Sequence, residues 1–447
     1  MAASVYDSAI YRDLFRDADA AALFTDAAEV RAMLLVEGAL AEAQGAAGLI
    51  PETAAAAIHR AAREVQIDPS SLAAETGTSA VVVPALVKAF RAAMQAPEHA
   101  QYIHWGATSQ DIVDTGLVLR LRQVVALYDR RLTATIRALG ALAEAHAALP
   151  MAGRTWGAAA TPSSFGAIAA AWGRPLLRLH ARLHALAPDL LSISLSGAAG
   201  TLSAMGARGP DIRAQMARAL GLTDPGGSWH AERDRMTAFT GWAADTAASV
   251  GKMGEDLSLM TQSGIAEIRL GQSGGSSTMP QKQNPVDPAL LVAIARHLAV
   301  LHAAMSGAAI HRQQRDGAAW LTEWLVLPQI CLGLARALAV AERMVPGLVP
   351  QPDAMARGLD PDGLSLTHAE ALSFALATLM PRPEAQAEVK ALCLQAMKDG
   401  TPLSDLAKGR WPDAGLGPVF DAATQMGTAP DEARAFAAAA RAIRDPD

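Results

Sequence analysis

The residues with the clearest potential for chemistry lie in one loop, Gly271-Gln-Ser-Gly-Gly-Ser-Ser-Thr-Met-Pro-Gln-Lys-Gln-Asn-Pro285. Its first half is glycine and serine, which leaves backbone N–H groups free to turn inward. Its second half holds Lys282 and Asn284 between two prolines. A mobile half with hydroxyls followed by a stiff half with a cation and an amide predicts a lid that closes over an anion. A long polar connection between helices would have the same composition.

A second segment runs from His104 to Thr115. Thr108 and Asp111 have the T-x-x-D spacing of a capping box, which by itself explains both residue types. The hydroxyls and free N–H groups at a helix start also suit a bound carboxylate. The spacing alone favours the cap.

A third segment, from Met151 to Gly166, is rich in small residues and carries one arginine among several hydroxyls. The Arg154 guanidinium has the fork geometry that binds a carboxylate through two hydrogen bonds. It could equally donate to the last carbonyls of the preceding helix. The segment leaves these two interpretations open.

Long helices are predicted around these segments. Apolar residues recur every three or four positions from Ser109 to Leu149, which predicts one helix about 60 Å long. A second stripe runs from Met236 to Met260, and a third from Leu290 to Met305. Asp287-Pro288 before the third stripe is typical of an N-cap followed by proline at the first helical position. Such helices with narrow apolar stripes predict an elongated bundle that buries surface within and between chains.

Composition excludes several classes of protein. Of 447 residues, 51% are apolar and 18% charged, which excludes intrinsic disorder. The net charge of −6 argues against nucleic acid as a partner. The most apolar stretch, Leu290 to Ile310, has Arg296, His297 and His302 in its middle, so burial in protein is expected there rather than in a membrane. With two cysteines and an acidic start without an apolar segment, the sequence predicts a cytoplasmic protein.

Breaks in the helical pattern predict three helical domains. A domain of shorter helices spans 1–105, the long-helix bundle spans 106–345, and a C-terminal helical domain spans 346–447, after a cluster of prolines and glycines. Most histidines in the helical patterns are expected to be packed or at the surface. They are His59, His146, His180, His184, His302 and His311.

In this order, the three segments resemble the signature regions of the fumarase/aspartase superfamily. Residues 275–285 resemble its pattern G-S-S-x-M-P-x-K-x-N-P. Within the superfamily the chain is most similar to the 3-carboxy-cis,cis-muconate cycloisomerases, and the similarity weakens after about residue 400. The stretches that carry this closer resemblance are Phe24-Thr-Asp26, Val36-Glu-Gly-Ala-Leu40, Gly106-Ala-Thr-Ser-Gln-Asp111, Arg154-Thr-Trp156 and Gln314-Arg-Asp-Gly-Ala-Ala-Trp-Leu-Thr-Glu-Trp324.

The resemblance implies an all-α homotetramer with a central twenty-helix core and active sites built from three subunits. It implies that Ser276 transfers the proton and that Lys282 and Asn284 hold the substrate carboxylate and stabilise its dianionic aci form. The hydroxyls of Thr108, Ser109 and Thr155 would bind carboxylates. Binding roles are also expected for His104, Arg154, Trp156 and Arg315, although Arg315 could instead pair with a neighbouring acid. No metal or organic cofactor is implied, and the substrate would be a small polycarboxylate.

Three departures from the superfamily bear on the substrate. Trp156 stands where adenylosuccinate lyases and fumarases have histidine, which disfavours those activities and fits a cycloisomerase. Ala158 replaces a usual glutamine, and Gln281 and Gln283 replace a basic pair, His and Arg. The favoured activity is lactonisation of 3-carboxy-cis,cis-muconate. The alternatives are a lyase that releases fumarate and a catalytically silent structural relative.

Overall fold

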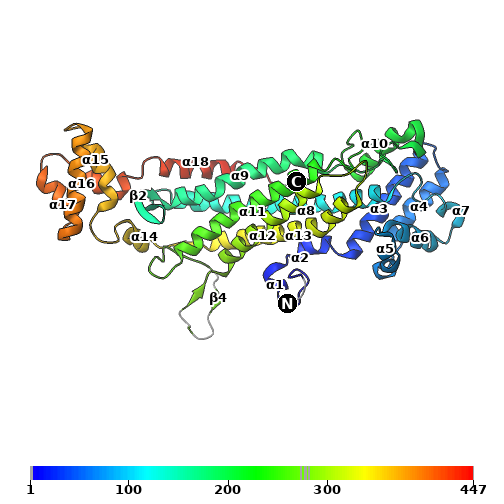
Figure 1. Cartoon of the computed structure of the whole chain (residues 1–447), viewed down its shortest axis with the longest axis horizontal. Coiled ribbons are helices and arrows are strands. Elements are labelled where there is room, and N and C mark those ends of the chain that lie inside the picture. The colour runs from blue at the N-terminus through cyan, green and yellow to red at the C-terminus, as the bar shows by residue number, and fades with distance from the viewer. Residues whose placement is uncertain (1–3, 272–273, 276–278, 280–281, 446–447) are drawn as a thin grey trace. The chain divides into compact units, whose positions relative to one another are not determined.

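The computed structural model describes residues 4–271, 274–275, 279 and 282–445. The described chain is mainly helical with only short strands (Figure 1), which confirms the all-α prediction. Its residues group into two compact units, each assembled from three separate stretches. Unit 1 comprises Met1–Arg130, Leu179–Ala248 and Ile294–Ala339, and unit 2 comprises Arg131–Arg178, Ser249–Ala293 and Val340–Asp447.

Five long helices run through the described chain, and each contributes residues to both units. They are α8 (Ser109–Ala145), α9 (Phe165–Leu190), α11 (Asp234–Met260), α12 (Val286–Ala308) and α13 (Gly317–Met344). Three of them were predicted from the apolar stripes at 109–149, 236–260 and 290–305, and the other two were not. The helix expected from Ser109 to Leu149 begins at the predicted residue and ends four positions earlier, at Ala145. Its stripe faces inward, since Leu121, Val124 and Ile136 are fully buried.

One predicted helix start is wrong by two residues. Asp287 was expected to precede the helix as its N-cap, but α12 already begins at Val286. Asp287 lies in the first turn, where both of its carboxylate oxygens accept hydrogen bonds from Arg343 of α13 at 2.8 Å. A carboxylate in a first turn is favourable beside the positive end of the helix dipole. An aspartate at position 287 is therefore explained as well by its ion pair with Arg343 as by the capping role that was expected for it.

In unit 1, aromatic side chains join four of the long helices. The Tyr128 hydroxyl donates to the carbonyl of Cys331 at 2.7 Å, which links α8 to α13. The Trp242 ring of α11 stacks on Phe239 and donates to the carbonyl of Leu179 in α9 at 2.8 Å. Buried indole and phenol groups need such polar partners, and each of these two hydrogen bonds fixes one helix against another.

The shorter helices of unit 1 surround a core of their own. Its buried side chains include Met33, Leu86 and Phe90, together with residues that follow α9 along the chain, such as Ile193 and Ile212. The expected domain limit at residue 105 stays a prediction. The helices are α1 (Arg12–Phe15), α2 (Ala18–Leu23), α3 (Asp26–Ala46), α4 (Glu52–Glu64), α5 (Ala73–Ser79), α6 (Val83–Met94), α7 (Pro97–Ala100) and α10 (Gly209–Leu220).

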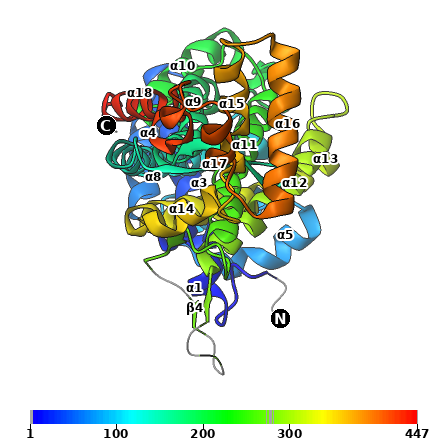
Figure 2. The same ribbon diagram turned by 90° about the vertical axis from the view of Figure 1, so that its left-hand side faces the viewer.

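Unit 2 holds the short strands and the last helices. Helices α15, α16 and α17 pack side by side (Figure 2) around Leu372, Leu376 and Leu403. The strands are β1 (Pro150–Thr155), β2 (Ala158–Ser164), β3 (Ile268–Arg269), β4 (Gly274–Gly275), β5 (Gln283–Asn284) and β6 (Val349–Pro350). The helices are α14 (Pro352–Leu359), α15 (Ala369–Leu376), α16 (Arg382–Asp399), α17 (Leu403–Arg410) and α18 (Ala429–Arg441). The expected domain limit at residue 345 also stays a prediction.

Two segments are long and apolar enough to cross a membrane by length and composition alone, Val286–Ala308 and Gly317–Gly347. The most apolar window of Gly317–Gly347 is 61% buried within the chain, as a core helix would be. That of Val286–Ala308 is only 28% buried. The protein burial expected for this stretch is therefore incomplete within one chain, and Val300 is left 69% exposed.

Candidate active site

The start of α8 is held by Asp111, a fully buried carboxylate. It accepts hydrogen bonds from the backbone N–H groups of Thr108, Ser196 and Gly197 at 2.8–3.0 Å, and from Nε2 of His230 at 2.9 Å. The predicted cap is thus confirmed for the Asp111 half of the T-x-x-D pair. The segment 196–197 is fixed beside the helix start by the same carboxylate.

The hydroxyl of Thr108 has a different partner. Nη1 of Arg315 donates to it at 2.6 Å, and Nε of Arg315 lies 3.3 Å from the side-chain oxygen of Gln110. The predicted ion pair of Arg315 with Asp316 or Glu323 is not among its described contacts. Instead the structure places a guanidinium against the hydroxyl expected to bind a carboxylate. A cation and a hydroxyl on a helix N-terminus form a suitable environment for an anion.

Behind this surface lies a buried ionic network that the sequence analysis did not single out. Arg233, fully buried, donates to Asp114 at 2.8 Å and to both oxygens of Glu323 at 2.5 and 2.8 Å. Asp114 also accepts from the side chains of Gln110 and Trp320. Because Gln110 contacts both Asp114 and Arg315, the network orients the residues at the start of α8. In the sequence, the signal that could have indicated this network was the presence of charged residues inside apolar stretches.

His104 sits just before α8 with a left-handed backbone, φ 64°. Its Nδ1 lies 2.7 Å from Oε1 of Glu37, whose side chain is 1% exposed. Burial opposes protonation of His104, but the charge and hydrogen bond of Glu37, with Asp111 further away, outweigh it and raise the pKa of His104. The site therefore favours a positive charge here.

A cavity of about 460 Å³ opens beside these residues, entirely within unit 1. Its walls bring together two of the predicted binding residues, His104 and Ser109, with two cations that the sequence analysis did not select, Lys88 and Arg91. Arg91 is fixed by a hydrogen bond to the carbonyl of Ile103 at 3.0 Å. The cavity can therefore take a molecule with more than one negative charge.

Thr155 and Trp156 are found on a feature that the sequence did not predict, a hairpin formed by β1 and β2. Trp156 and Gly157 make its two-residue turn with φ of 54° and 82°, between the paired residues Thr155 and Ala158. Positive φ at both turn positions matches the twist of a hairpin, but is costly for a residue with a bulky side chain. The Trp156 side chain is fully exposed, so no contact within the described part of the chain covers it.

Within the described chain, Arg154 pairs with a carboxylate and not with the helix-end carbonyls that were one of the two roles considered for it. Its guanidinium binds Glu267 through two parallel hydrogen bonds of 2.7 and 2.9 Å. Glu267 is buried beside Gly358, where a Cβ would come within 2.6 Å of the carboxylate and 3.0 Å of the guanidinium. A contact between Arg154 and the substrate stays a prediction. In such a contact, Arg154 would have to bind the substrate and Glu267 at the same time.

The base of the predicted lid loop is a short ladder. Gly274 pairs with Asn284 and Gly275 with Gln283, so these two short strands lie side by side. Lys282 is exposed and Asn284 half-buried. Ser276 and Gln281 lie outside the described residues. Lid closure stays a prediction.

Comparisons with known proteins agree with the helical architecture. A model of a family described as lyase matches residues 16–299. The chain is 38% identical to 3-carboxy-cis,cis-muconate cycloisomerase of Pseudomonas aeruginosa, over 86% of this chain and 84% of that protein. It belongs to the lyase family of the fumarase/aspartase superfamily.

Other members of this lyase family extend the similarity. The cycloisomerase of Pseudomonas putida is 37% identical over 84% of this chain and 90% of that protein. The crystal structure of 3-carboxy-cis,cis-muconate lactonizing enzyme from Pseudomonas putida has a TM-score of 0.91 and 32% identity, covering 97% of this chain and 99% of that one. The match extends over nearly the whole chain, including the C-terminal helices.

Proposed function

We propose that this lyase-family enzyme is a 3-carboxy-cis,cis-muconate cycloisomerase. It would lactonise 3-carboxy-cis,cis-muconate to 4-carboxymuconolactone in the protocatechuate branch of the β-ketoadipate pathway. The observation that carries the proposal is the near-full-length similarity to cycloisomerases, 38% identity over 86% of the chain. The cluster of cations at the start of α8 supports it, because the substrate carries three carboxylates.

In this proposal the substrate is held at the start of α8. The hydroxyls of Thr108 and Ser109 and the N-terminal N–H groups of the helix bind one carboxylate, with Arg315 beside Thr108. His104 lines the adjoining cavity and binds the substrate there. Thr155 and Trp156 come from the hairpin tip, and Arg154 fixes the strand below them through Glu267. These groups place the reacting carboxylate against the double bond.

The chemistry proceeds in two steps. One substrate carboxylate oxygen attacks the double bond, a C–O bond forms, and the π electrons move onto a second carboxylate to give the dianionic aci form. Lys282 and Asn284 stabilise this charge as it develops. Ser276 then donates its proton to the adjacent carbon, which completes the lactone and leaves an alkoxide that is reprotonated. Atoms and electrons balance without a metal or an organic cofactor.

The enzyme is proposed to work as a homotetramer whose sites combine segments from three subunits around a twenty-helix core. Support comes from two surfaces that one chain leaves uncovered. The apolar window of α12 is only 28% buried, and Trp156, with a positive φ of 54°, is fully exposed among the described residues of its own chain. Both are typical of faces that a second copy buries. We also propose a cytoplasmic location and the three-domain division at residues 105 and 345.

The deciding experiment follows the ultraviolet absorbance of the conjugated diene when 3-carboxy-cis,cis-muconate is mixed with the enzyme. The wild type should remove the signal, and Ser276→Ala should slow it about 10²- to 10⁴-fold, the usual contribution of a proton-transferring group. Ser277→Ala is the matched control and should retain far more activity. If the wild type leaves the diene unchanged, the cycloisomerase proposal is wrong. Release of fumarate from succinyl adducts would then be tested. Gln281 and Gln283 would be the first explanation for a different substrate.

A further inference from the structure

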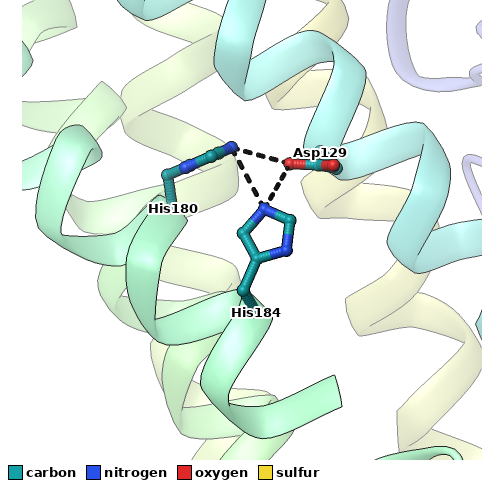
Figure 3. Close-up of side chains that lie close together, drawn as sticks. All are labelled: Asp129, His180 and His184. Carbon is teal, nitrogen blue, oxygen red and sulfur yellow. Dashed lines mark hydrogen bonds and ion pairs between the residues drawn. The ribbon is translucent and has the colours of Figure 1, made fainter. Parts of the chain in front are cut away.

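A cluster of three potential metal ligands lies in unit 1, and none of the three is among the residues assigned to the candidate active site. Asp129 is on α8, and His180 and His184 are one turn apart on α9 (Figure 3). Oδ1 of Asp129 lies 2.7 Å from Nε2 of His180 and 3.1 Å from Nε2 of His184. The two Nε2 atoms are 3.4 Å from each other. All three side chains thus point their ligand atoms at one place.

One of the three separations already has the value found in a zinc site, and the other two are shorter. Zinc binds nitrogen and carboxylate oxygen at about 2.0–2.2 Å in tetrahedral geometry, which places two ligand atoms about 3.3–3.5 Å apart. The Nε2–Nε2 distance of 3.4 Å already has this value. The two distances to Asp129 need only a small opening, which rotation of the carboxylate can supply.

The chemistry of the cluster also favours an ion. If both imidazoles donate to Oδ1 of Asp129, two N–H groups crowd together within 3.4 Å. A single divalent cation would replace both protons and accept all three lone pairs.

The site has a route for entry. Asp129 and His180 are 11% and 12% exposed, whereas His184 is 58% exposed. An ion can therefore reach the cluster from solvent, and water can complete its coordination. Among the residues that the structure describes, no other group of histidine, cysteine and acidic ligands gathers so closely.

We propose that Asp129, His180 and His184 bind a divalent transition-metal ion of the zinc class and thereby clip α8 to α9. Imidazole and carboxylate ligands suit zinc and reject the soft ions that prefer sulfur. An ion that binds the folded chain alone stabilises it by mass action. The role is structural and independent of the lactonisation chemistry.

The test uses the full chain without a polyhistidine tag, freed of metal by chelator. Equilibrium dialysis against zinc alone should give one ion per chain, and cobalt should give the strong visible absorption of a tetrahedral complex. His184→Ala and Asp129→Asn should each weaken zinc binding at least about tenfold, because even outer-shell changes have effects of that size. His297→Ala, which removes an exposed histidine of α12, is the matched control and should bind as the wild type does.

Thermal unfolding gives an independent readout. Zinc should raise the midpoint of the wild type and of His297→Ala, and leave that of His184→Ala unchanged. His184 is the most exposed of the three side chains, so its removal should not prevent folding. The proposal is overturned if the wild type takes up no zinc, or if His184→Ala and the wild type bind it equally well.

Discussion

Arg315 donates a hydrogen bond to the hydroxyl of Thr108 across 2.6 Å, although 207 residues separate them in the sequence. The Thr108 hydroxyl thus contacts a guanidinium, whereas the backbone N–H of Thr108 donates to the Asp111 carboxylate. At the start of α8, the Thr108 hydroxyl therefore serves substrate binding in the proposed site, whereas the Asp111 carboxylate serves the stability of the fold. Thr108 and Asp111 should therefore respond differently to substitution.

Thr108→Val keeps the shape of the side chain and removes only its hydroxyl. We expect kcat/KM for 3-carboxy-cis,cis-muconate to fall about tenfold, as befits one hydrogen bond to a charged group. The free energy of unfolding in urea should hardly change. Asp111→Asn is the contrasting variant, because it removes a buried charge that accepts from four donors. It should lower the free energy of unfolding by about 3 kcal/mol or more.

The pair of His104 and Glu37 predicts a dependence of stability on pH. The pKa of His104 is raised in the folded state, where burial is outweighed by Glu37 and then Asp111. The resulting stabilisation is full below the unfolded pKa of about 6.5 and is lost as the pH rises through the higher folded value. Glu37→Gln should reduce the change in the free energy of unfolding over this pH range. Urea unfolding between about pH 6 and 8 measures it, and an unchanged slope in Glu37→Gln would contradict the assignment.

Gly358 should not tolerate a side chain. A Cβ there would meet Oε1 of Glu267 at 2.6 Å and the Arg154 guanidinium at 3.0 Å. Gly358→Ala should therefore force the pair apart and lower the free energy of unfolding by about 1–3 kcal/mol. Gly409→Ala is the matched control in helix α17, where nothing lies within 4 Å. It should raise the free energy of unfolding by about 0.5–1 kcal/mol.

Sites shared between chains predict recovery of activity on mixing. Ser276→Ala and Arg315→Ala should each be nearly inactive alone. Unfolded and refolded together, they should regain a measurable part of the wild-type rate, because some sites then draw intact segments from both chains. Ser276→Ala mixed with Lys282→Ala is the control, since both changes fall in the same loop. If the first mixture recovers no more activity than the control mixture, the proposal that each active site is built from several chains is wrong.

Local patterns predicted much of this structure. The stripe that begins at Ser109 predicted α8 because burial every three or four residues leaves a direct mark on sequence. Asp111 was placed correctly as a cap for the same local reason. The β1–β2 hairpin was missed because its alanines, threonine and serines have neither strand alternation nor a common turn pair.

Partners distant in sequence could not be found in the same way. Glu37 beside His104 and Glu267 beside Arg154 depend on how separate helices and strands pack. A buried acid within an apolar stretch indicates that some cation must meet it, but does not identify that cation. The same holds for Asp129, whose histidines lie on another helix.

The two units have a practical consequence for protein engineering. Each is assembled from three separated stretches, and the boundaries at residues 130, 178, 248, 293 and 339 all fall inside helices. Truncation at any of these points would leave a severed helix with an apolar face and no partner. Neither unit can be expressed as a fragment by choosing two end points. A split version of the enzyme should instead be divided in a connection such as residues 221–233, and both halves should be produced together.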